Sequence, residues 1–207
     1  MLLLCDFDGT ITTTDVTDLL WDRFGTPGWR DRLLGPYRRG ETTILEVMDT
    51  GWGEVAESEA ELLAYARPRV ALRSGFENLL SVCRQRGWTF HVVSCGLDWY
   101  LKALLTADVP FVSFEATRDA RWRVTLPRGC VLVDGTDFKV HAMRRLQALH
   151  PGQHTIFIGD GRNDLPAARA ANRRFAVRGS TLARLCTRQG LECEQFDTFD
   201  DVIARLS

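Results

Sequence analysis

The sequence contains no long hydrophobic run. No stretch of its 207 residues approaches the roughly 18 apolar residues that are needed to cross a membrane. The apolar start of the chain ends at Asp6, which makes it too short for the hydrophobic core of a signal peptide. We therefore expect a cytoplasmic protein that has no membrane partner.

Charge of one sign is not in excess either, because 26 basic residues stand against 27 acidic ones and the net charge is −1. Such a balance provides no strong field for nucleic acid or for an anionic membrane surface, so we expect neither as a partner. Lysine itself is rare: Lys102 and Lys139 are the two lysines among these basic residues, and the others are arginines. Coding composition is the plain explanation, yet a lysine retained in such a chain raises the question of its role.

Paired cysteine motifs are also missing. The six cysteines are scattered without a Cys-x-x-Cys pair, which argues against a zinc site and a disulfide framework and favours reduced, mostly buried thiols. The four histidines show no metal-ligand spacing, so we interpret them as structural or surface residues. The length suits one domain with an elaboration, or one domain with a small second lobe.

What the sequence does contain is an alternation of short apolar segments and helical patterns. Strands are predicted at Leu2–Cys5, Trp88–Val93, Pro110–Glu115, Trp122–Leu126, His154–Ile158, Phe175–Val177 and near Cys193–Phe196. Helices are predicted at Phe76–Arg86, Asp98–Leu105, Asp137–Leu149, Leu165–Ala171, Leu182–Arg188 and Asp200–Leu206. Strands that alternate with helices favour an α/β fold, in which helices cover both faces of a Rossmann-like parallel sheet.

The stretch between the first predicted strand and this alternating part has a different character. Helical spacing dominates from Asp15 to Glu61, with breaks at glycine and proline residues. We interpret this block as a small helical cap inserted after the first strand. The predicted division is a core of residues 1–12 and 71–207 and a cap of residues 13–70.

Two aspartates follow the first predicted strand, in Asp6-Phe7-Asp8-Gly9-Thr10. Ligands of parallel α/β sheets bind beyond the carboxyl ends of the strands, which is where this motif falls. In an extended segment Asp6 and Asp8 share a face, and two neighbouring carboxylates become tolerable beside a hard divalent cation such as Mg²⁺. A polar loop with two acidic residues and no such role is the alternative.

A second acidic cluster follows the strand that ends at Ile158, in Gly159-Asp160-Gly161-Arg162-Asn163-Asp164. Asp160 is predicted to complete a metal site with Asp6. Asn163 and Asp164 precede a predicted helix, so capping of that helix is the plain interpretation, and a dual role is the other.

Polar residues occur at two further places where a phosphate is expected. Ser94-Cys95-Gly96 is predicted as a strand-to-helix turn, whose hydroxyl and backbone N–H groups suit a phosphate. Cys95 is disfavoured as a nucleophile, because Leu101 stands where the arginine of a Cys-x₅-Arg phosphate loop would be. Lys139, near the start of a predicted helix, is either an ordinary surface lysine or a partner for a phosphate and a nucleophilic carboxylate.

Together these residues resemble the four motifs of the haloacid dehalogenase superfamily of aspartate-based phosphatases. The motifs occur in order at Asp6–Thr10, Ser94, Lys139 and Gly159–Asp164, and the resemblance covers essentially the whole chain. It implies a haloacid dehalogenase-like core, Mg²⁺ as cofactor and a small phosphomonoester as substrate. The helical insertion is similar to that of the phosphoserine-phosphatase-like subfamily.

The resemblance also implies a role for each matching residue. Asp6 is the expected nucleophile that forms an aspartyl-phosphate, and Asp8 is the expected general acid and base. Mg²⁺ is expected on the Asp6 carboxylate, the Asp8 backbone carbonyl, Asp160 and waters. Asp164 is expected to support this site. The expected phosphate-binding residues are Thr10, Ser94, Cys95, Gly96, Lys139 and Asn163.

Within this subfamily the chain most resembles the phosphatases that act on 2-hydroxy-3-keto-5-methylthiopentenyl-1-phosphate in methionine salvage. Stretches at Arg73–Phe76, Val93–Asp98 and Phe175–Arg178 carry this likeness. Phosphoserine is the alternative substrate, since Asp15 stands where phosphoserine phosphatases have a glutamate for the substrate ammonium. No arginine from Glu41 to Ala66 is available to clamp an amino-acid carboxylate, which favours the first substrate.

The tryptophans of the expected cap bear on the same choice. Trp21, Trp29 and Trp52 are interpreted as core residues rather than as a substrate wall, although Trp21 or Trp52 is expected to pack against an apolar substrate tail. A phosphomutase would need the same core with a cap that admits a sugar phosphate. A phosphoacceptor signalling domain would be shorter, would lack the acid at Asp8 and would need no cap.

Overall fold

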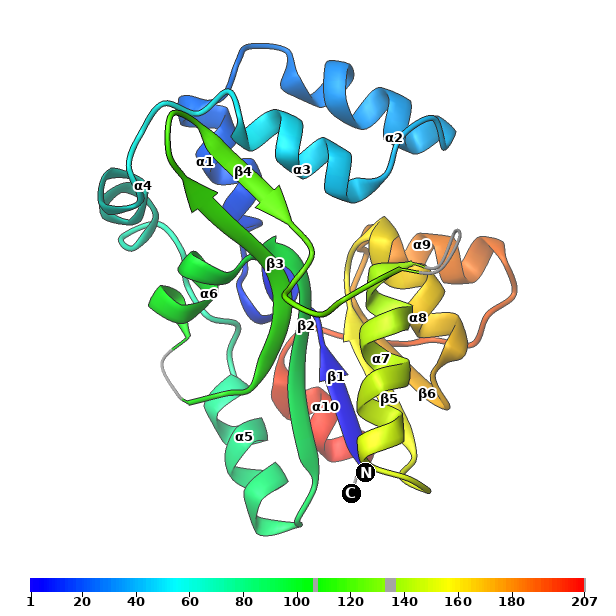
Figure 1. Cartoon of the computed structure of the whole chain (residues 1–207). Coiled ribbons are helices and arrows are strands. Elements are labelled where there is room, and N and C mark those ends of the chain that lie inside the picture. The colour runs from blue at the N-terminus through cyan, green and yellow to red at the C-terminus, as the bar shows by residue number, and fades with distance from the viewer. Residues whose placement is uncertain (106–107, 133–136, 207) are drawn as a thin grey trace.

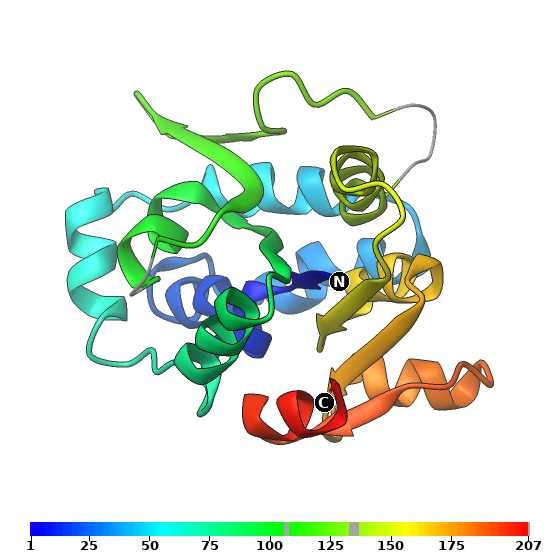
Figure 2. The ribbon, with the colours of Figure 1, turned by 90° about the horizontal axis from the view of Figure 1, so that it is seen from below.

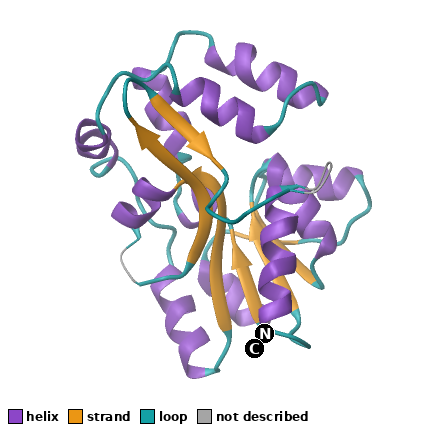
Figure 3. Cartoon of the chain, viewed as in Figure 1, coloured by secondary structure: helices purple, strands orange, loops and turns teal. Residues whose placement is uncertain are grey.

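The computed structural model describes residues 1–105, 108–132 and 137–206, and their strands form one seven-stranded sheet. The order in the sheet is β4-β3-β2-β1-β5-β6-β7 (Figures 1 and 3). The strands are β1 (Leu2–Cys5), β2 (Thr89–Leu97), β3 (Phe111–Arg118), β4 (Trp122–Thr125), β5 (Thr155–Gly159), β6 (Arg173–Val177) and β7 (Glu194–Phe196). The first strand lies in the middle, between the two other strands that carry predicted motifs.

The sheet is mostly parallel, as the alternating pattern predicts. Five of its neighbouring pairs are parallel, and β3 pairs antiparallel with β4. The exception has a simple cause: residues 119–121 alone connect β3 to β4, and a parallel pair needs a crossover of a dozen residues or more. The pattern predicted both strands but not the direction of the second.

Helices cover both faces of this sheet, and the side chains of β1 show how. Leu3 and Cys5 point into a core that includes residues of α5 (Phe76–Gln85) and α10 (Phe199–Leu206). Leu2 and Leu4 point into a second core with residues of α7 (Phe138–Leu149), α8 (Leu165–Ala170) and α9 (Thr181–Arg188). Figure 2 shows α7 and α10 on opposite sides of β1. A further helix, α6 (Asp98–Leu104), follows β2 directly. A strand buried on both faces explains the unbroken apolar run at the start of the chain.

A block of helices follows β1 and lies beyond the ends at which β1 and β2 finish (Figure 1). It contains α1 (Val16–Phe24), α2 (Gly35–Arg39), α3 (Ile44–Trp52) and α4 (Glu59–Ala66). Local capping fixes where several of them begin: capping boxes form between Thr43 and Glu46 and between Ser58 and Glu61. The chain enters and leaves this block side by side, because Thr12 and Leu72 form an antiparallel bridge. The assignment of residues 13–70 to a separate cap stays a prediction.

The hairpin of β3 and β4 packs against this helical block. The backbone N–H of Val124 donates to Asp49 Oδ1 in α3 at 2.8 Å, and Trp122 Nε1 donates to the Glu57 carbonyl at 3.0 Å. Trp52 packs edge-on against Trp122 and Trp99, with ring centroids 6.1 and 5.8 Å away, and those two rings stack on each other at 5.6 Å. These contacts join the helical block to the β3–β4 hairpin of the sheet.

Two further predictions concern the state of the cysteines and the presence of a membrane-spanning helix. All six cysteines are free thiols, and four of them are buried. Within the described residues, no helix combines the length and the apolar character that a membrane span requires.

The Ser94-Cys95-Gly96 motif differs from its prediction as a turn. β2 does not end at Val93 but continues to Leu97, so Ser94, Cys95 and Gly96 lie in its last residues. The register against β3 shifts between Val93 and Leu97, which marks an irregularity at this point. Because a bulge re-aims the side chains that follow it, the strand can present this motif to the site without ending.

Candidate active site

The predicted motifs meet at one end of the sheet, around a cavity of about 320 Å³. Eight residues named from the sequence line it: Asp6, Asp8, Asp15, Ser94, Cys95, Gly96, Asp160 and Asn163. The other three, Thr10, Lys139 and Asp164, are fully buried. The structure thus brings together the ends of β1, β2 and β5 as the positions of the motifs predict.

Lys139 is a buried residue rather than a surface lysine. Its Nζ donates to Asp6 Oδ1 at 2.6 Å and to Asp164 Oδ1 at 2.5 Å. The carboxylate of Asp137 accepts the backbone N–H groups of Lys139 and Val140, which fixes the first turn of α7 beneath the site. Burial alone would lower the pKa of Lys139, but the charges of Asp164 and Asp6 hold that pKa well above its ordinary value. The lysine is therefore a permanent cation between two aspartates.

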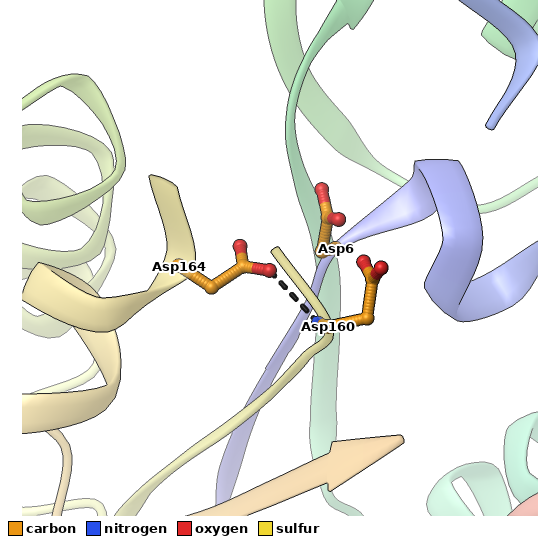
Figure 4. Close-up of side chains that lie close together, drawn as sticks. All are labelled: Asp6, Asp160 and Asp164. Carbon is orange, nitrogen blue, oxygen red and sulfur yellow. Dashed lines mark hydrogen bonds between the residues drawn. The ribbon is translucent and has the colours of Figure 1, made fainter. Parts of the chain in front are cut away.

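Asp164 connects this lysine to the loop after β5. Its Oδ2 accepts the backbone N–H group of Asp160 at 2.9 Å (Figure 4). The same oxygen accepts the backbone N–H group of Gly161 at 2.7 Å. Gly159 leaves room for this carboxylate, because a Cβ there would lie 2.6 Å from Asp164 Cγ. Asp164 stands at the N-cap position of α8 but its side chain makes no capping hydrogen bond to that helix, so the predicted capping role is corrected: the carboxylate binds the turn before α8 and holds Lys139.

Three carboxylates offer a candidate metal site. Asp6, Asp160 and Asp164 each have an oxygen within 4.8 Å of one in the others (Figure 4). Burial, followed by the charge of Asp164, raises the pKa of Asp6 to about 7 even though Lys139 opposes the shift. Burial and the charges of Asp6 and Asp164 raise the pKa of Asp160 to about 8. One lysine does not offset so much negative charge, and oxygen donors of this kind fit a hard divalent cation.

The loop after β1 is shaped to hold Asp160 in place. Thr10 Oγ1 donates to Asp160 Oδ1 at 3.0 Å. Gly9 has a φ of 75°, and a Cβ at this position would lie 2.7 Å from Asp160 Oδ2. Arg73 clamps the loop from outside, since its guanidinium donates to the carbonyls of Gly9 at 2.7 Å and of Thr10 at 2.8 Å. Thr10 therefore supports an acidic residue here rather than reaching the cavity itself.

The side chain of Asp8 has surroundings of its own and takes no part in the three-carboxylate cluster. Its Oδ1 accepts the backbone N–H of Val16 at 3.0 Å, and its Oδ2 accepts the Tyr100 hydroxyl at 2.7 Å. Burial, together with the charges of Asp15 and Asp6, raises the pKa of Asp8 well above its ordinary value. A carboxyl group with a raised pKa is suited to donate a proton. That its backbone carbonyl binds metal stays a prediction.

Cys95 is not a thiolate nucleophile. Burial raises its pKa to about 12, so the thiol is neutral at physiological pH. Ser94 has its side chain turned along the strand, where Oγ accepts the backbone N–H of Gly96 at 2.9 Å. Both residues line the cavity, as does Asn163.

The helical block forms the opposite wall, which is largely apolar. Its apolar lining residues are Trp21, Trp29, Leu34, Ile44, Val47 and Met48. The expectation for the tryptophans is therefore corrected in part: Trp21 and Trp29 line the cavity although each is almost fully buried, whereas Trp52 is completely buried in the tryptophan cluster and does not reach it.

Polar residues of the same wall include two that bear on substrate choice. Asp15 lines the cavity, and one of its carboxylate oxygens accepts the backbone N–H of Asp18 at 2.8 Å as the N-cap of α1. Arg38 also lines the cavity. The absence of an arginine from Glu41 to Ala66 therefore does not mean that the wall has none, because Arg38 lies just before that stretch.

Three functional candidates were not predicted as site residues: Tyr100, Arg38 and Arg73. Tyr100 belongs to an ordinary apolar helical pattern, which gives no sign of its contact with Asp8. Arg38 and Arg73 are two of many arginines, so their residue type alone did not distinguish them. All three residues are identified only by their position next to the site in the folded structure.

Comparison with known proteins agrees with this geometry. The haloacid dehalogenase-like hydrolase family matches residues 3–169. The 2-hydroxy-3-keto-5-methylthiopentenyl-1-phosphate phosphatase of Geobacillus kaustophilus is 27% identical, over 100% of this chain and 95% of its own length. The polyol phosphate phosphatase of Saccharomyces cerevisiae is also 27% identical, over 99% of this chain and 92% of its own.

Solved structures give the same result for the fold. A phospho-aspartyl intermediate analogue of phosphoserine phosphatase superposes with a TM-score of 0.75 at 17% identity, covering 99% of this chain and 97% of that one. Substrate-bound phosphoserine phosphatase gives the same TM-score and coverage. Because the family match spans most of the chain and includes the loops that form the site, the chain belongs to the haloacid dehalogenase-like hydrolases and is a phosphatase of that type.

Proposed function

We propose that this phosphatase hydrolyses a small phosphorylated metabolite through an aspartyl-phosphate on Asp6. One observation carries the proposal: Asp6 lines the cavity while Lys139, fully buried behind it, holds one of its carboxylate oxygens at 2.6 Å. An oriented carboxylate facing a cavity of metabolite size is the arrangement that nucleophilic attack on phosphorus requires.

The first step forms one bond and breaks another. A carboxylate oxygen of Asp6 attacks phosphorus, and the bond between phosphorus and the ester oxygen breaks. The departing alkoxide takes a proton from Asp8, which lines the same cavity. Lys139 stays charged throughout, so it can stabilise the anionic phosphoryl group in the transition state. Ser94, at the end of β2, supplies a neutral hydrogen-bonding partner for the same group.

The second step returns the enzyme to its starting state. Water attacks phosphorus, Asp8 accepts the proton of that water, and the Asp6 carboxylate departs. The carboxyl group of Asp8 thus gives a proton in one step and recovers it in the next. Inorganic phosphate is the product, which separates this reaction from the phosphomutase alternative, whose product is an isomeric phosphate ester.

Mg²⁺ is the proposed cofactor, with Asp6, Asp160 and the Asp8 backbone carbonyl as the residues that would hold it. When bound there, it would screen the repulsion between the anionic nucleophile and the anionic phosphate. Asp164 has an oxygen in the same cluster, but its contacts to Lys139, Asp160 and Gly161 favour a supporting role.

For the substrate we propose 2-hydroxy-3-keto-5-methylthiopentenyl-1-phosphate. The apolar wall from Trp21 to Met48 suits a methylthio tail, and the likeness to phosphatases of that name supports the same choice. Phosphoserine is the second candidate, favoured by one observation: Arg38 and Asp15 line the same wall, with opposite charges for a carboxylate and an ammonium.

A panel of phosphorylated metabolites distinguishes these candidates. The purified protein with Mg²⁺ is expected to release phosphate from the methylthio compound with the highest kcat/KM, ahead of phosphoserine and of polyol and sugar phosphates. A preference for phosphoserine that disappears in Arg38→Met would assign the enzyme to the second candidate. If the protein releases no phosphate from any member of a broad panel, the proposal is wrong.

A further inference from the structure

We propose that Tyr100 is the positioning residue of Asp8, and that its hydroxyl fixes the carboxyl group which exchanges protons with the leaving group and with water. The inference rests on the proposed function, because it assigns a helper to the general acid and base. Tyr100 itself does not line the cavity, so its effect on the reaction passes through Asp8.

The hydrogen bonds at Tyr100 have a defined direction. Its hydroxyl lies 2.7 Å from Asp8 Oδ2 and 3.1 Å from Thr17 Oγ1. The Tyr100 hydroxyl donates to Asp8 Oδ2, which uses its single phenolic proton. Thr17 must then donate its own proton to the phenolic oxygen. The chain runs from Thr17 through Tyr100 to Asp8.

The ring of Tyr100 is held firmly enough for this role. The side chain is fully buried, and its ring packs edge-on against Trp99 with centroids 5.2 Å apart and lies 6.2 Å from the Phe7 ring. A buried aromatic side chain in contact with neighbouring rings has few accessible rotamers. The position of the Tyr100 hydroxyl is therefore well defined relative to the carboxyl group of Asp8.

The choice of glycine at position 96 supports the same conclusion. A Cβ at Gly96 would lie 2.0 Å from the Tyr100 hydroxyl oxygen and 2.4 Å from Asp8 Oδ2. No side chain fits there without breaking the pair. Gly96 was predicted as part of a phosphate-binding turn, and the structure gives it a second reason: the tyrosine and the aspartate occupy the space above it.

Two hydrogen bonds together define the plane of the Asp8 carboxyl group. Val16, at the start of α1, donates its backbone N–H to Oδ1, while Tyr100 in α6 donates to Oδ2. A group held at both oxygens cannot rotate freely, and catalytic groups lose rate when their geometry loosens. Without the tyrosine hydroxyl, one of the two constraints is gone.

Leaving-group dependence gives a readout that a merely structural role would not produce. The Tyr100→Phe variant is expected to lower kcat/KM about 10- to 100-fold for an alkyl phosphate, the range for loss of one hydrogen bond to a charged group. For acetyl phosphate, whose acetate leaves without a proton, kcat/KM is expected to change by less than about threefold. The alkyl phosphate is the best substrate of the metabolite panel, and KM is expected to stay close to the wild-type value.

Two comparisons complete the experiment. Tyr65→Phe is the matched control: it removes a tyrosine hydroxyl from α4, where the ring packs on Phe24 and Arg69, and it is expected to behave as wild type with both substrates. In an Asp8→Asn background, Tyr100→Phe is expected to have no further effect on kcat/KM for the alkyl phosphate. Thermal melting of each variant checks that the fold is retained.

The outcomes separate the two proposals. If wild type is active and Asp8→Asn is impaired, but Tyr100→Phe equals wild type, the positioning role is wrong and the proposed function stands. Equal losses with alkyl phosphate and acetyl phosphate, or independent effects of Tyr100 and Asp8, also overturn the positioning role. If Asp8→Asn keeps wild-type kcat/KM, the acid–base role of Asp8 fails, and the role of Tyr100 fails with it.

Discussion

Lys139 and Asp6 form a buried ion pair in which Nζ lies 2.6 Å from Oδ1, with the lysine side chain fully buried and the aspartate side chain 6% exposed. The partners are separated by more than half the chain, so the contact joins α7 to the end of β1. Removing one member of such a pair leaves an uncompensated buried charge, which costs far more than losing a pair on the surface.

Replacement of this lysine should destabilise the fold as well as abolish turnover. Lys139→Met leaves both Asp6 and Asp164 without their cation, so the free energy of unfolding is expected to fall by about 3–5 kcal/mol. The other lysine is a matched control: Lys102 is exposed and pairs with Asp98 at 2.6 Å, and Lys102→Met is expected to cost less than about 1 kcal/mol. Denaturant unfolding with a chelator present measures both, and equal costs would contradict the ion-pair argument.

Asp6→Asn tests the nucleophile. The amide has nearly the shape of the carboxylate but is a poor nucleophile, so phosphate release is expected to fall below detection. The melting temperature is expected to stay near that of wild type, because Lys139 keeps Asp164 as its counter-charge and the change removes one of three crowded carboxylates. Asp31→Asn, an exposed aspartate in the helical block, should leave turnover unchanged. Wild-type turnover by the Asp6 variant would remove Asp6 from the mechanism.

The sequence was sufficient for the parts of the site that lie at strand ends. A buried strand followed by acidic residues is unusual, so Asp6 and Asp160 could be predicted. The rarity of lysine in the chain drew attention to Lys139, and the resemblance to a known family gave it a role. The parallel sheet followed from the alternation of strands and helices. These features depend on residues close together in the sequence, or on motifs whose order is itself informative.

The remaining features depend on how distant segments pack. Tyr100 has the pattern of an ordinary core residue, and its hydroxyl reaches Asp8 because β2 extends past Ser94 and α6 begins after it. Arg38 lies in a short helix whose facing direction no periodicity defines. Trp52 and Trp21 are the same residue type in the same helical block, yet Trp52 packs among other tryptophans whereas Trp21 lines the cavity. Residue type and spacing do not contain this information.

Metal binding should be visible without any assay of turnover. Mg²⁺ at 100 times its dissociation constant is expected to stabilise the wild-type fold by about 2.7 kcal/mol, because it binds the folded state alone. Asp160→Asn keeps an acceptor for Thr10 but loses a charge, so the Mg²⁺-induced rise in melting temperature should shrink or vanish. Asp31→Asn should keep the full rise. An equal rise in the Asp160 variant would exclude Asp160 as a ligand.

Asp15 should make stability depend on pH in a predictable direction. Burial, with the charge of Asp18 adding to it, raises the pKa of Asp15 from 3.8 to about 7. The folded state therefore binds this proton more tightly than the unfolded state, and the resulting stabilisation is lost as pH rises between these two values. The difference in unfolding free energy between wild type and Asp15→Asn should fall from low pH to about pH 7 and then level off. Denaturant titrations in chelator measure it, and a flat or rising difference would contradict the raised pKa.

Substrate choice should respond to the apolar wall of the cavity. Ile44 lines the cavity, while its neighbour Leu45 is equally half-buried in α3 but does not. Ile44→Asn is expected to lower kcat/KM for the methylthio-substituted keto-pentenyl phosphate by about 10-fold, since one apolar contact in a pocket is worth about that much. Phosphoserine, which has no apolar tail, should lose less than about threefold, so the ratio of the two kcat/KM values is the quantity to measure.

Leu45→Asn controls for a polar residue in the same helix and should leave that ratio unchanged. If Ile44→Asn lowers kcat/KM equally for both substrates, the apolar wall does not select the substrate. The same conclusion follows if kcat/KM of the wild type is tenfold higher for phosphoserine than for the methylthio compound. The opposite charges of Arg38 and Asp15 then become the better explanation of substrate choice.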